Sequence, residues 1–241
     1  MRRLGWRHCM KSLVCIPTYN EKENIEAITA AVLSVTDEST HVLVIDDNSP
    51  DGTGEIVRRL MTLNPRLQIL SRAKKEGLGR AYIAGFKWGL DQGYDVIVEM
   101  DADFSHRPED LVKILSAVAT KDFAVGSRYV PGGRTVNWGL SRKIISRGGS
   151  LYTRLILGYP LADWTGGFNA WKNHVLRKIN LDQVKSNGYS FQIELKYRAL
   201  KNHLEGVEVP IVFEDRRVGK SKMSLKIVLE AFTRVWGMRF G

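Results

Sequence analysis

Two aspartates, Asp101 and Asp103, stand where an apolar strand is expected to end. They follow the apolar run 96–100, and one residue separates them, so both carboxylates can face the same cation. Mg²⁺ and Mn²⁺ prefer oxygen ligands and often bind one or two carboxylates while substrate phosphates fill other positions. The pair therefore predicts a divalent cation beside a phosphate-bearing substrate. On these residues alone, an ordinary polar turn remains the alternative.

A second acidic segment, residues 46–53, follows an earlier apolar run. Its Asp, Asn, Pro and Gly residues are typical of a tight turn. In a binding site, Asp47 would accept hydrogen bonds from a base or a ribose. Tyr19, after the first apolar run, would stack on a base, and Glu21 would accept from a hydroxyl. The two interpretations stay open at this point.

The elements expected to position these residues are repeated strand-and-helix units. Short apolar, β-rich runs recur every 26 to 29 residues, which leaves room for a crossover helix after each strand. This pattern predicts an α/β fold, a mostly parallel central sheet with helices on both faces, whose ligands gather at the carboxyl ends of the strands. The expected strands cover residues 12–16, 41–45, 67–70, 95–100 and 123–125, with a further one near 207–213.

Helix signals fill the gaps between these strands. Asn20 can cap a helix with Glu23 three residues on, and a later helix is expected to begin at Pro108. In the first helix the expected buried stripe consists of Ile25, Ile28, Ala31 and Val32.

The net charge of +10 lies entirely in the second half of the chain. Residues 1–120 carry 15 Lys+Arg and 17 Asp+Glu, whereas residues 121–241 carry 21 and 9. Such asymmetry indicates a partner rich in negative charge: nucleic acid, anionic lipid or a phosphorylated substrate, unless it is only a solvated basic face. We expect no nucleic acid, because the acidic segments near Asp47 and Asp101 would repel a polyanion.

Other features narrow the class of protein. Cys9 and Cys15 show no metal-ligand spacing, and none of the five histidines is expected to be a ligand, His106 being the only one near the acidic pair. No run reaches the ~20 apolar residues that span a bilayer, so a reducing cytoplasm is the expected location.

Taken together and in order, the motifs resemble those of dolichol-phosphate mannosyltransferases, inverting GT-A glycosyltransferases of family 2. The resemblance extends from Ser12 to Lys222. It rests on residues 17–21, 46–53, 77–79, 100–106, 126–129, 146–148, 163–168, 188–191 and 215–222.

The resemblance implies roles for individual residues and a Mg²⁺ or Mn²⁺ cofactor held by Asp101 and Asp103. It implies a catalytic set of Asp101, Asp103, Arg128 and Arg216, with Arg128 and Arg147 toward the acceptor phosphate. The residues implied in nucleotide-sugar binding are Pro17, Tyr19, Glu21, Ile45, Asp47, Asp101, Ala102, Asp103, Arg128, Arg216 and Lys222.

The implied reaction moves mannose from GDP-mannose to dolichyl or polyprenyl phosphate with inversion, giving a β-linked product. The form of residues 48–51 favours GDP-mannose over UDP-sugars. A UDP-glucose or other UDP-sugar transferase for the same lipids is the nearest alternative, and a non-catalytic lipid- or nucleic-acid-binding module is a more distant one. Where some relatives carry Gln as a further metal ligand, this chain has Ser105, a weaker oxygen donor.

We expect one glycosyltransferase domain over residues 1–241. It comprises a nucleotide-sugar half (1–120), an acceptor half (121–222) and a C-terminal amphipathic helix (223–241). That helix either lies at a membrane interface or closes the core, since its apolar residues follow helical spacing: Leu225, Val228, Leu229, Phe232 and Trp236. The expected setting is peripheral on the cytoplasmic face of a membrane, with a small membrane protein as a further possible partner.

Overall fold

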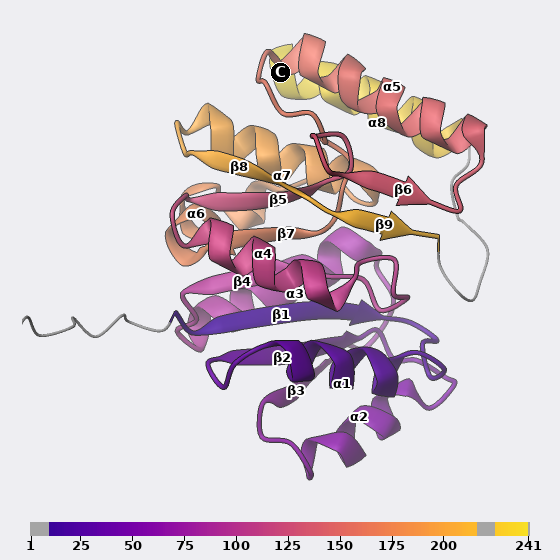
Figure 1. Cartoon of the computed structure of the whole chain (residues 1–241), viewed down its shortest axis with the longest axis vertical. Coiled ribbons are helices and arrows are strands. Elements are labelled where there is room, and N and C mark those ends of the chain that lie inside the picture. The colour runs from indigo at the N-terminus through magenta and orange to yellow at the C-terminus, as the bar shows by residue number, and fades with distance from the viewer. Residues whose placement is uncertain (1–9, 216–224, 241) are drawn as a thin grey trace, which may run out of the picture.

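A seven-stranded sheet forms the centre of the computed structural model, which describes residues 10–215 and 225–240 (Figure 1). The strand order is β3-β2-β1-β4-β7-β5-β8, and every strand except β7 runs in the same direction. The strands are β1 (Ser12–Thr18), β2 (Thr40–Asp46), β3 (Leu67–Ser71), β4 (Val96–Glu99), β5 (Phe123–Ser127), β7 (Asn169–Lys172) and β8 (Gly206–Pro210).

Helices cover both faces of this sheet because its strands are apolar on both sides. Along β1, Leu13 and Cys15 pack into one core cluster, whereas Val14 and Ile16 pack into the other. The first cluster lies under α3 (Leu78–Asp91), α6 (Asn173–Lys178), the 3₁₀ turn Leu181–Gln183 and α7 (Tyr189–Lys201). The second lies under α1 (Ile25–Val35), α2 (Thr53–Met61) and α4 (Pro108–Val118). The predicted α/β fold is confirmed.

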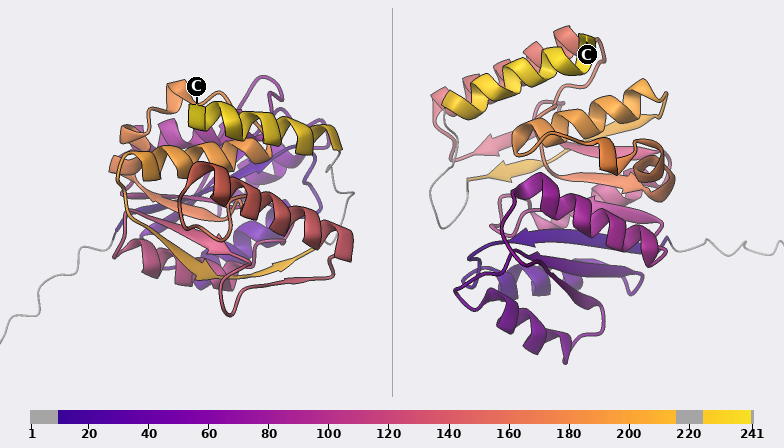
Figure 2. Two further views of the ribbon diagram at one scale, coloured as in Figure 1. Left: turned by 90° about the horizontal axis from the view of Figure 1, so that it is seen from above. Right: turned by 180° about the vertical axis from the view of Figure 1, so that it is seen from behind.

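Two further helices, α5 (Leu140–Leu157) and α8 (Leu225–Phe240), lie side by side beyond α7 (Figures 1 and 2). Leu157, Trp164, Tyr197 and Val235 belong to a third apolar cluster that joins them to the body of the protein. The rings of Tyr152 on α5 and Phe232 on α8 stack with centroids 3.9 Å apart. In the part of the chain that the structure describes, no helix is long and apolar enough to cross a membrane.

The second half departs from the predicted strand pattern. Strand β7 was not expected, and it is inserted antiparallel between β4 and β5. The expected strand near 207–213 is two strands, β8 and β9 (Val212–Glu214), and β9 pairs with β6 (Arg134–Val136) in a separate sheet. The division falls at Pro210, which has no N–H for a ladder, and at Ile211, whose side chain turns into the core.

The first helix also begins later than predicted. Helix α1 starts at Ile25 after Asn24, so the prediction that Asn20 caps it is wrong. Asn20 has a φ of 61°, and its amide is engaged by the neighbouring loop. Ala31 is only partly buried, while Thr29 and Leu33 join the buried face. The predicted start of α4 at Pro108 is confirmed.

Candidate active site

The segments that follow β1, β2 and β4 converge at one edge of the sheet. These three strands are parallel neighbours, with Thr18 opposite Asp46 and Cys15 opposite Glu99. Residues 17–21, 46–53 and 100–106 therefore leave the sheet together, at the edge where ligands of such folds bind. Asp47 donates its backbone N–H to the Thr18 carbonyl at 3.1 Å, which closes the first two segments on each other.

Three consecutive amides connect the β1–α1 loop to the β2–α2 loop. The backbone N–H groups of Asn20, Glu21 and Lys22 donate to the side chains of Ser49 (3.1 Å), Thr53 (3.0 Å) and Asp51 (3.1 Å), respectively. The polar residues that read as a turn in the sequence are thus the acceptors that hold the neighbouring loop. The helix does not begin at Asn20 because the φ of this residue, 61°, lies outside the extended region that an N-cap residue adopts.

Asp47 is buried opposite a cation, with only 5% of its surface exposed. Its Oδ1 accepts from Arg72 at 2.7 Å, and Arg72 also pairs with Glu76 at 2.8 Å. Burial raises the pKa of Asp47 above its ordinary value, while Arg72 acts against that rise. Tyr19 lies nearby with the Lys75 ammonium 3.8 Å from its ring centroid. Both residues predicted to bind a base or ribose are therefore at this edge.

The other residues predicted to bind nucleotide have different surroundings. Pro17 is partly buried at the end of β1, and the Glu21 carboxylate accepts from the side-chain Nδ2 of Asn24 at 2.9 Å. Ile45 has no exposed surface, because its side chain packs in the core beneath Gly85 of α3. The structure thus places the Ile45 side chain inside the core and away from the exposed surface of the site.

Asp101 and Asp103 remain partly exposed at the end of β4, with Ala102 buried between them. The hydroxyl of Tyr82 donates to Asp101 at 3.4 Å, and Asp103 accepts the Ser105 amide at 3.1 Å. His106 supports the turn from below, since its Nδ1 accepts the Asp101 amide at 3.0 Å. Burial lowers the pKa of His106 to about 4, so the ring is neutral at pH 7.

The carboxylate oxygens of Asp101 and Asp103 fit a hard divalent cation for which the protein supplies only part of the ligands. Among the described residues, no group of three or more His, Cys, Asp or Glu side chains is arranged for a metal. Two carboxylates are nevertheless enough for Mg²⁺ or Mn²⁺ when phosphate and water supply the remaining oxygens. The buried Ser105 hydroxyl has no hydrogen-bond partner. Its oxygen, two residues beyond Asp103, is therefore available as a further metal ligand.

Arg128, at the end of β5, forms a bidentate ion pair that the sequence did not reveal. Its Nε and Nη2 donate to the two carboxylate oxygens of Asp163, both at 2.7 Å, and Nη2 also donates to Thr165 at 2.8 Å. Burial acts to raise the pKa of Asp163, but the charge and hydrogen bonds of Arg128 outweigh it and leave that pKa below its ordinary value. Arg128 is itself only 7% exposed.

The other predicted phosphate ligands are less defined. Arg147 is exposed on α5, next to Ser146, whose hydroxyl accepts from Tyr129 at 2.7 Å and lies 3.5 Å from Thr165. Ser146, the chain neighbour of Arg147, therefore lies beside Thr165, which accepts a hydrogen bond from Arg128. Arg216 and Lys222 lie outside the described residues.

A buried polar network beneath the site was missed by sequence reasoning. Glu99, fully buried on β4, accepts from Trp171 at 2.7 Å, from Asn169 at 3.4 Å and from Gln192. Burial raises the pKa of Glu99 to about 7. The signal was a glutamate inside an apolar strand. The side chains of Trp171 and of Trp164 are fully buried and belong to the core.

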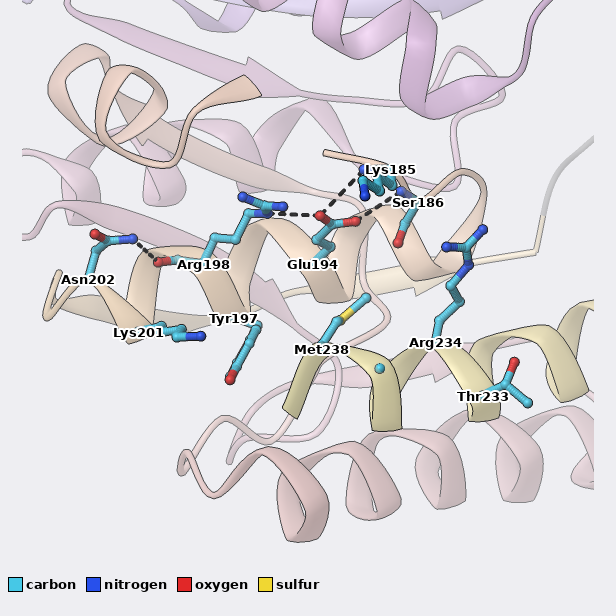
Figure 3. A pocket seen from close by; sticks show the side chains of 11 residues that line it. Lys185, Ser186, Glu194, Tyr197, Arg198, Lys201, Asn202, Thr233, Arg234 and Met238 are labelled. Atoms are coloured by element: carbon cyan, nitrogen blue, oxygen red, sulfur yellow. Dashed lines mark hydrogen bonds and ion pairs between the residues drawn. The ribbon is translucent and has the colours of Figure 1, made fainter. Parts of the chain in front are cut away.

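A large cavity lies away from this edge, between α7 and α8 (Figure 3). It has a volume of about 780 Å³, and its lining includes Lys185, Lys201 and Arg234. Glu194 also lines it, but this carboxylate is engaged by Arg198 at 2.8 Å and by the Ser186 amide at 2.9 Å. The cavity is therefore a basic groove, and it contains none of the residues at the carboxyl ends of β1, β2 and β4.

Comparisons with known proteins identify the family of this chain. A family model described as glycosyl transferase family 2 matches residues 13–181. The chain is 50% identical over 231 residues to the undecaprenyl-phosphate mannosyltransferase of Micrococcus luteus, covering 95% of both proteins. It is 48% identical over 237 residues to the polyprenol monophosphomannose synthase of Mycolicibacterium smegmatis, covering 97% of this chain and 89% of that protein.

A solved structure supports the fold. Glucosyl-3-phosphoglycerate synthase from Mycobacterium tuberculosis, in complex with Mn²⁺, UDP and phosphoglyceric acid, superposes with a TM-score of 0.71 over 96% of this chain and 79% of that one. At 15% sequence identity this likeness concerns the fold alone. The family model covers well over half of the chain, and two relatives are about half identical along nearly all of it. The chain therefore belongs to glycosyl transferase family 2 and is a glycosyltransferase.

Proposed function

We propose that this enzyme transfers mannose from GDP-mannose to a polyprenyl or dolichyl phosphate, with inversion at C1 of the sugar. The observation that carries the proposal is the near-complete coverage of two relatives, about 50% identical, whose names describe mannosyl transfer to polyprenyl lipids. Those relatives favour mannosyl transfer over the UDP-glucose alternative. Membership of a glycosyltransferase family weighs against a non-catalytic binding module.

The surroundings of Asp47 support a guanine nucleotide. Guanine presents two adjacent N–H donors on one edge, whereas uracil presents one. A carboxylate has two oxygens with several acceptor positions, so Asp47 can accept both guanine donors while Arg72 holds it in place. Tyr19 is available to stack on the base and Glu21 to accept from the ribose.

Asp101 and Asp103 would hold Mg²⁺ or Mn²⁺ against the diphosphate of the donor. The cation would supply charge neutralisation for the departing GDP. The backbone of the turn contributes rigidity, because the Asp101 amide is fixed by His106 and the Asp103 carboxylate by the Ser105 amide. Both carboxylates are thereby kept on the exposed side of the site.

The transfer needs no dedicated base in this proposal. A lipid phosphate has a second pKa near ~6, so its attacking oxygen is already largely anionic at neutral pH. That oxygen attacks C1, the bond from C1 to the GDP oxygen breaks, and the sugar is inverted. The enzyme then has to align the reactants and offset charge. Arg128 and Arg147 would orient the acceptor phosphate, with Arg216 and Lys222 contributing from outside the described residues.

The outer face of α5 and α8 supports binding to a membrane surface. Several large apolar side chains are exposed on these two adjacent helices: Leu140, Ile144, Ile145, Leu151 and Leu155 on α5, and Phe232, Trp236 and Phe240 on α8. Lys143, Arg147 and Arg239 are exposed on the same helices. Exposed apolar residues interspersed with cations are typical of interfacial helices. We include in the proposal a peripheral position on the cytoplasmic face, where a small membrane protein could share this surface.

A radiolabel transfer assay tests the proposed function. Purified protein is incubated with Mn²⁺, polyprenyl phosphate and labelled GDP-mannose or UDP-glucose, and label is measured in the organic phase. We expect label from GDP-mannose only. Chelation with EDTA or the variant Asp103→Asn should remove it, whereas the surface variant Glu109→Gln should not. Label from UDP-glucose alone, or label that persists in Asp103→Asn, would overturn the proposal.

A further inference from the structure

Lys196, on α7, is a fully buried cation with all three of its donors used. Its Nζ donates to the backbone carbonyls of Asp163 at 3.2 Å, Trp164 at 3.1 Å and Gly166 at 2.8 Å. An ammonium group has three N–H donors, so its hydrogen-bonding capacity is filled by one short segment of backbone. No acceptor in this set comes from elsewhere in the chain.

The same segment, residues 163–166 between α5 and β7, also holds Arg128. The Asp163 carboxylate accepts from the Arg128 backbone amide at 2.9 Å and from Nε and Nη2 at 2.7 Å each. Thr165 accepts a further bond from Nη2 at 2.8 Å. Lys196 thus binds the backbone of the segment whose side chains determine the direction of the Arg128 guanidinium.

The charge of Lys196 is offset within the core. Burial lowers the pKa of Lys196 to about 8, with Asp163 and Glu99 opposing the decrease, so the side chain is still a cation at neutral pH. Burying a charge is costly, and an apolar side chain of similar volume often gives equal or better stability. Packing alone therefore does not explain an ammonium group at this position. Its three hydrogen bonds to one backbone segment do explain it.

We propose that Lys196 is a positioning residue for the transfer reaction, which fixes the backbone of residues 163–166 and thereby the orientation of Arg128 toward the acceptor phosphate. The inference rests on the proposed function, because that function assigns Arg128 to the acceptor. Lys196 touches neither substrate in this account. Its effect passes through Asp163 and Thr165.

The test compares Lys196→Met with Lys201→Met, a matched change at an exposed lysine on the same helix, in the full chain. Misplacement of an orienting group by about 1 Å can cost ~100-fold in rate. For Lys196→Met we therefore expect a rise in KM for polyprenyl phosphate and a fall in kcat, each about tenfold or more. The Kd for GDP with Mn²⁺ should stay within about twofold of wild type, because the residues near Asp47 are untouched. Lys201→Met should match wild type in all three quantities.

A second measurement reports on Arg128 without relying on activity. In wild type, the Nε–H of Arg128 is buried in its bond to Asp163, so its ¹H–¹⁵N NMR signal should exchange slowly with water. In Lys196→Met that signal should exchange faster, and if that variant does not fold, Lys196→Gln should show the same change to a smaller degree. Wild-type KM, kcat and Arg128 exchange in a folded Lys196 variant would overturn the inference. Absence of transfer in wild type would instead refute the proposed function, and Arg128 exchange would still test the role of Lys196.

Discussion

Asp163→Asn should be among the most damaging single substitutions in the protein. Asp163 is fully buried and accepts four bonds, from the Nε, Nη2 and backbone amide of Arg128 and from the Gly166 amide at 3.0 Å. An asparagine would turn an NH₂ group toward these donors and leave the Arg128 charge without its partner. Breaking one side of a buried ion pair costs about 3–5 kcal/mol, and we expect that loss in the free energy of unfolding.

The assay is denaturant unfolding of Asp163→Asn at pH 7 and at lower pH, with Glu26→Gln as control. Glu26 forms an exposed pair with Arg59 at 3.2 Å, which is worth about 0–1 kcal/mol. The pKa of Asp163 is lowered in the folded protein, so its contribution is complete above the unfolded pKa of ~3.9 and is lost as pH falls through the folded value. The difference between wild type and Asp163→Asn should therefore shrink below about pH 4. A loss no larger than that of Glu26→Gln would refute the reasoning.

Three other changes test separate parts of the site. Arg72→Met leaves Asp47 without its cation. The KM for the sugar nucleotide should therefore rise about 10- to 150-fold, which corresponds to a loss of roughly 1.5–3 kcal/mol. The acidic limb of donor binding, measured by calorimetry, should move to higher pH as the Asp47 pKa rises. Gly77→Ala should lower the free energy of unfolding in urea by roughly 1–3 kcal/mol. The φ of Gly77 is +101°, and a Cβ there would lie 2.2 Å from the side-chain Nδ2 of Asn187. Unchanged stability would contradict this reasoning. Replacing Trp236 and Phe240 together by Ala should reduce cosedimentation with anionic vesicles several-fold without lowering the melting temperature, since both side chains are at least half exposed.

The first half of the chain was predictable because its signals are local. Apolar runs at regular spacing identify parallel strands, and polar segments directly after them must meet at one edge, as residues 17–21, 46–53 and 100–106 do. The helix start at Pro108 follows from proline chemistry in the same way. The predicted start of α1 was wrong because Asn20 has a φ of 61°, in a loop whose amides bond to the next loop, and neither loop reveals this contact alone.

The second half was harder because its order depends on contacts between distant residues. Strand β7 is four residues long and mixes Asn169 and Lys172 with Ala and Trp, so it has no alternating pattern to detect. Arg128 and Asp163 are 35 residues apart, and nothing in the sequence indicates that their side chains pair. Lys196 lies among charged neighbours on α7 and gives no sign of being buried. Only the packing of α7 on this segment makes its role visible.

The C-terminal helix packs on the core and also leaves large apolar side chains exposed. Val235 is buried against the third cluster, so α8 does close the core on one side. Phe232 and Trp236, expected on the apolar stripe, are 43% and 50% exposed. Helix α5, which lies beside α8, also exposes large apolar side chains, and the sequence alone had not connected the two helices.

The most direct test of the account is an NMR observation of the sugar carbon that reacts. GDP-mannose labelled with ¹³C at C1 is mixed with polyprenyl phosphate, Mg²⁺ and the full chain, and the C1 signal is followed with time. We predict that the α-linked donor signal is replaced by a β-linked mannosyl phosphate signal as GDP is released, and that Asp103→Asn prevents the change. An α-linked product would contradict direct displacement, and an unchanged donor signal with wild-type protein would contradict the assigned reaction itself.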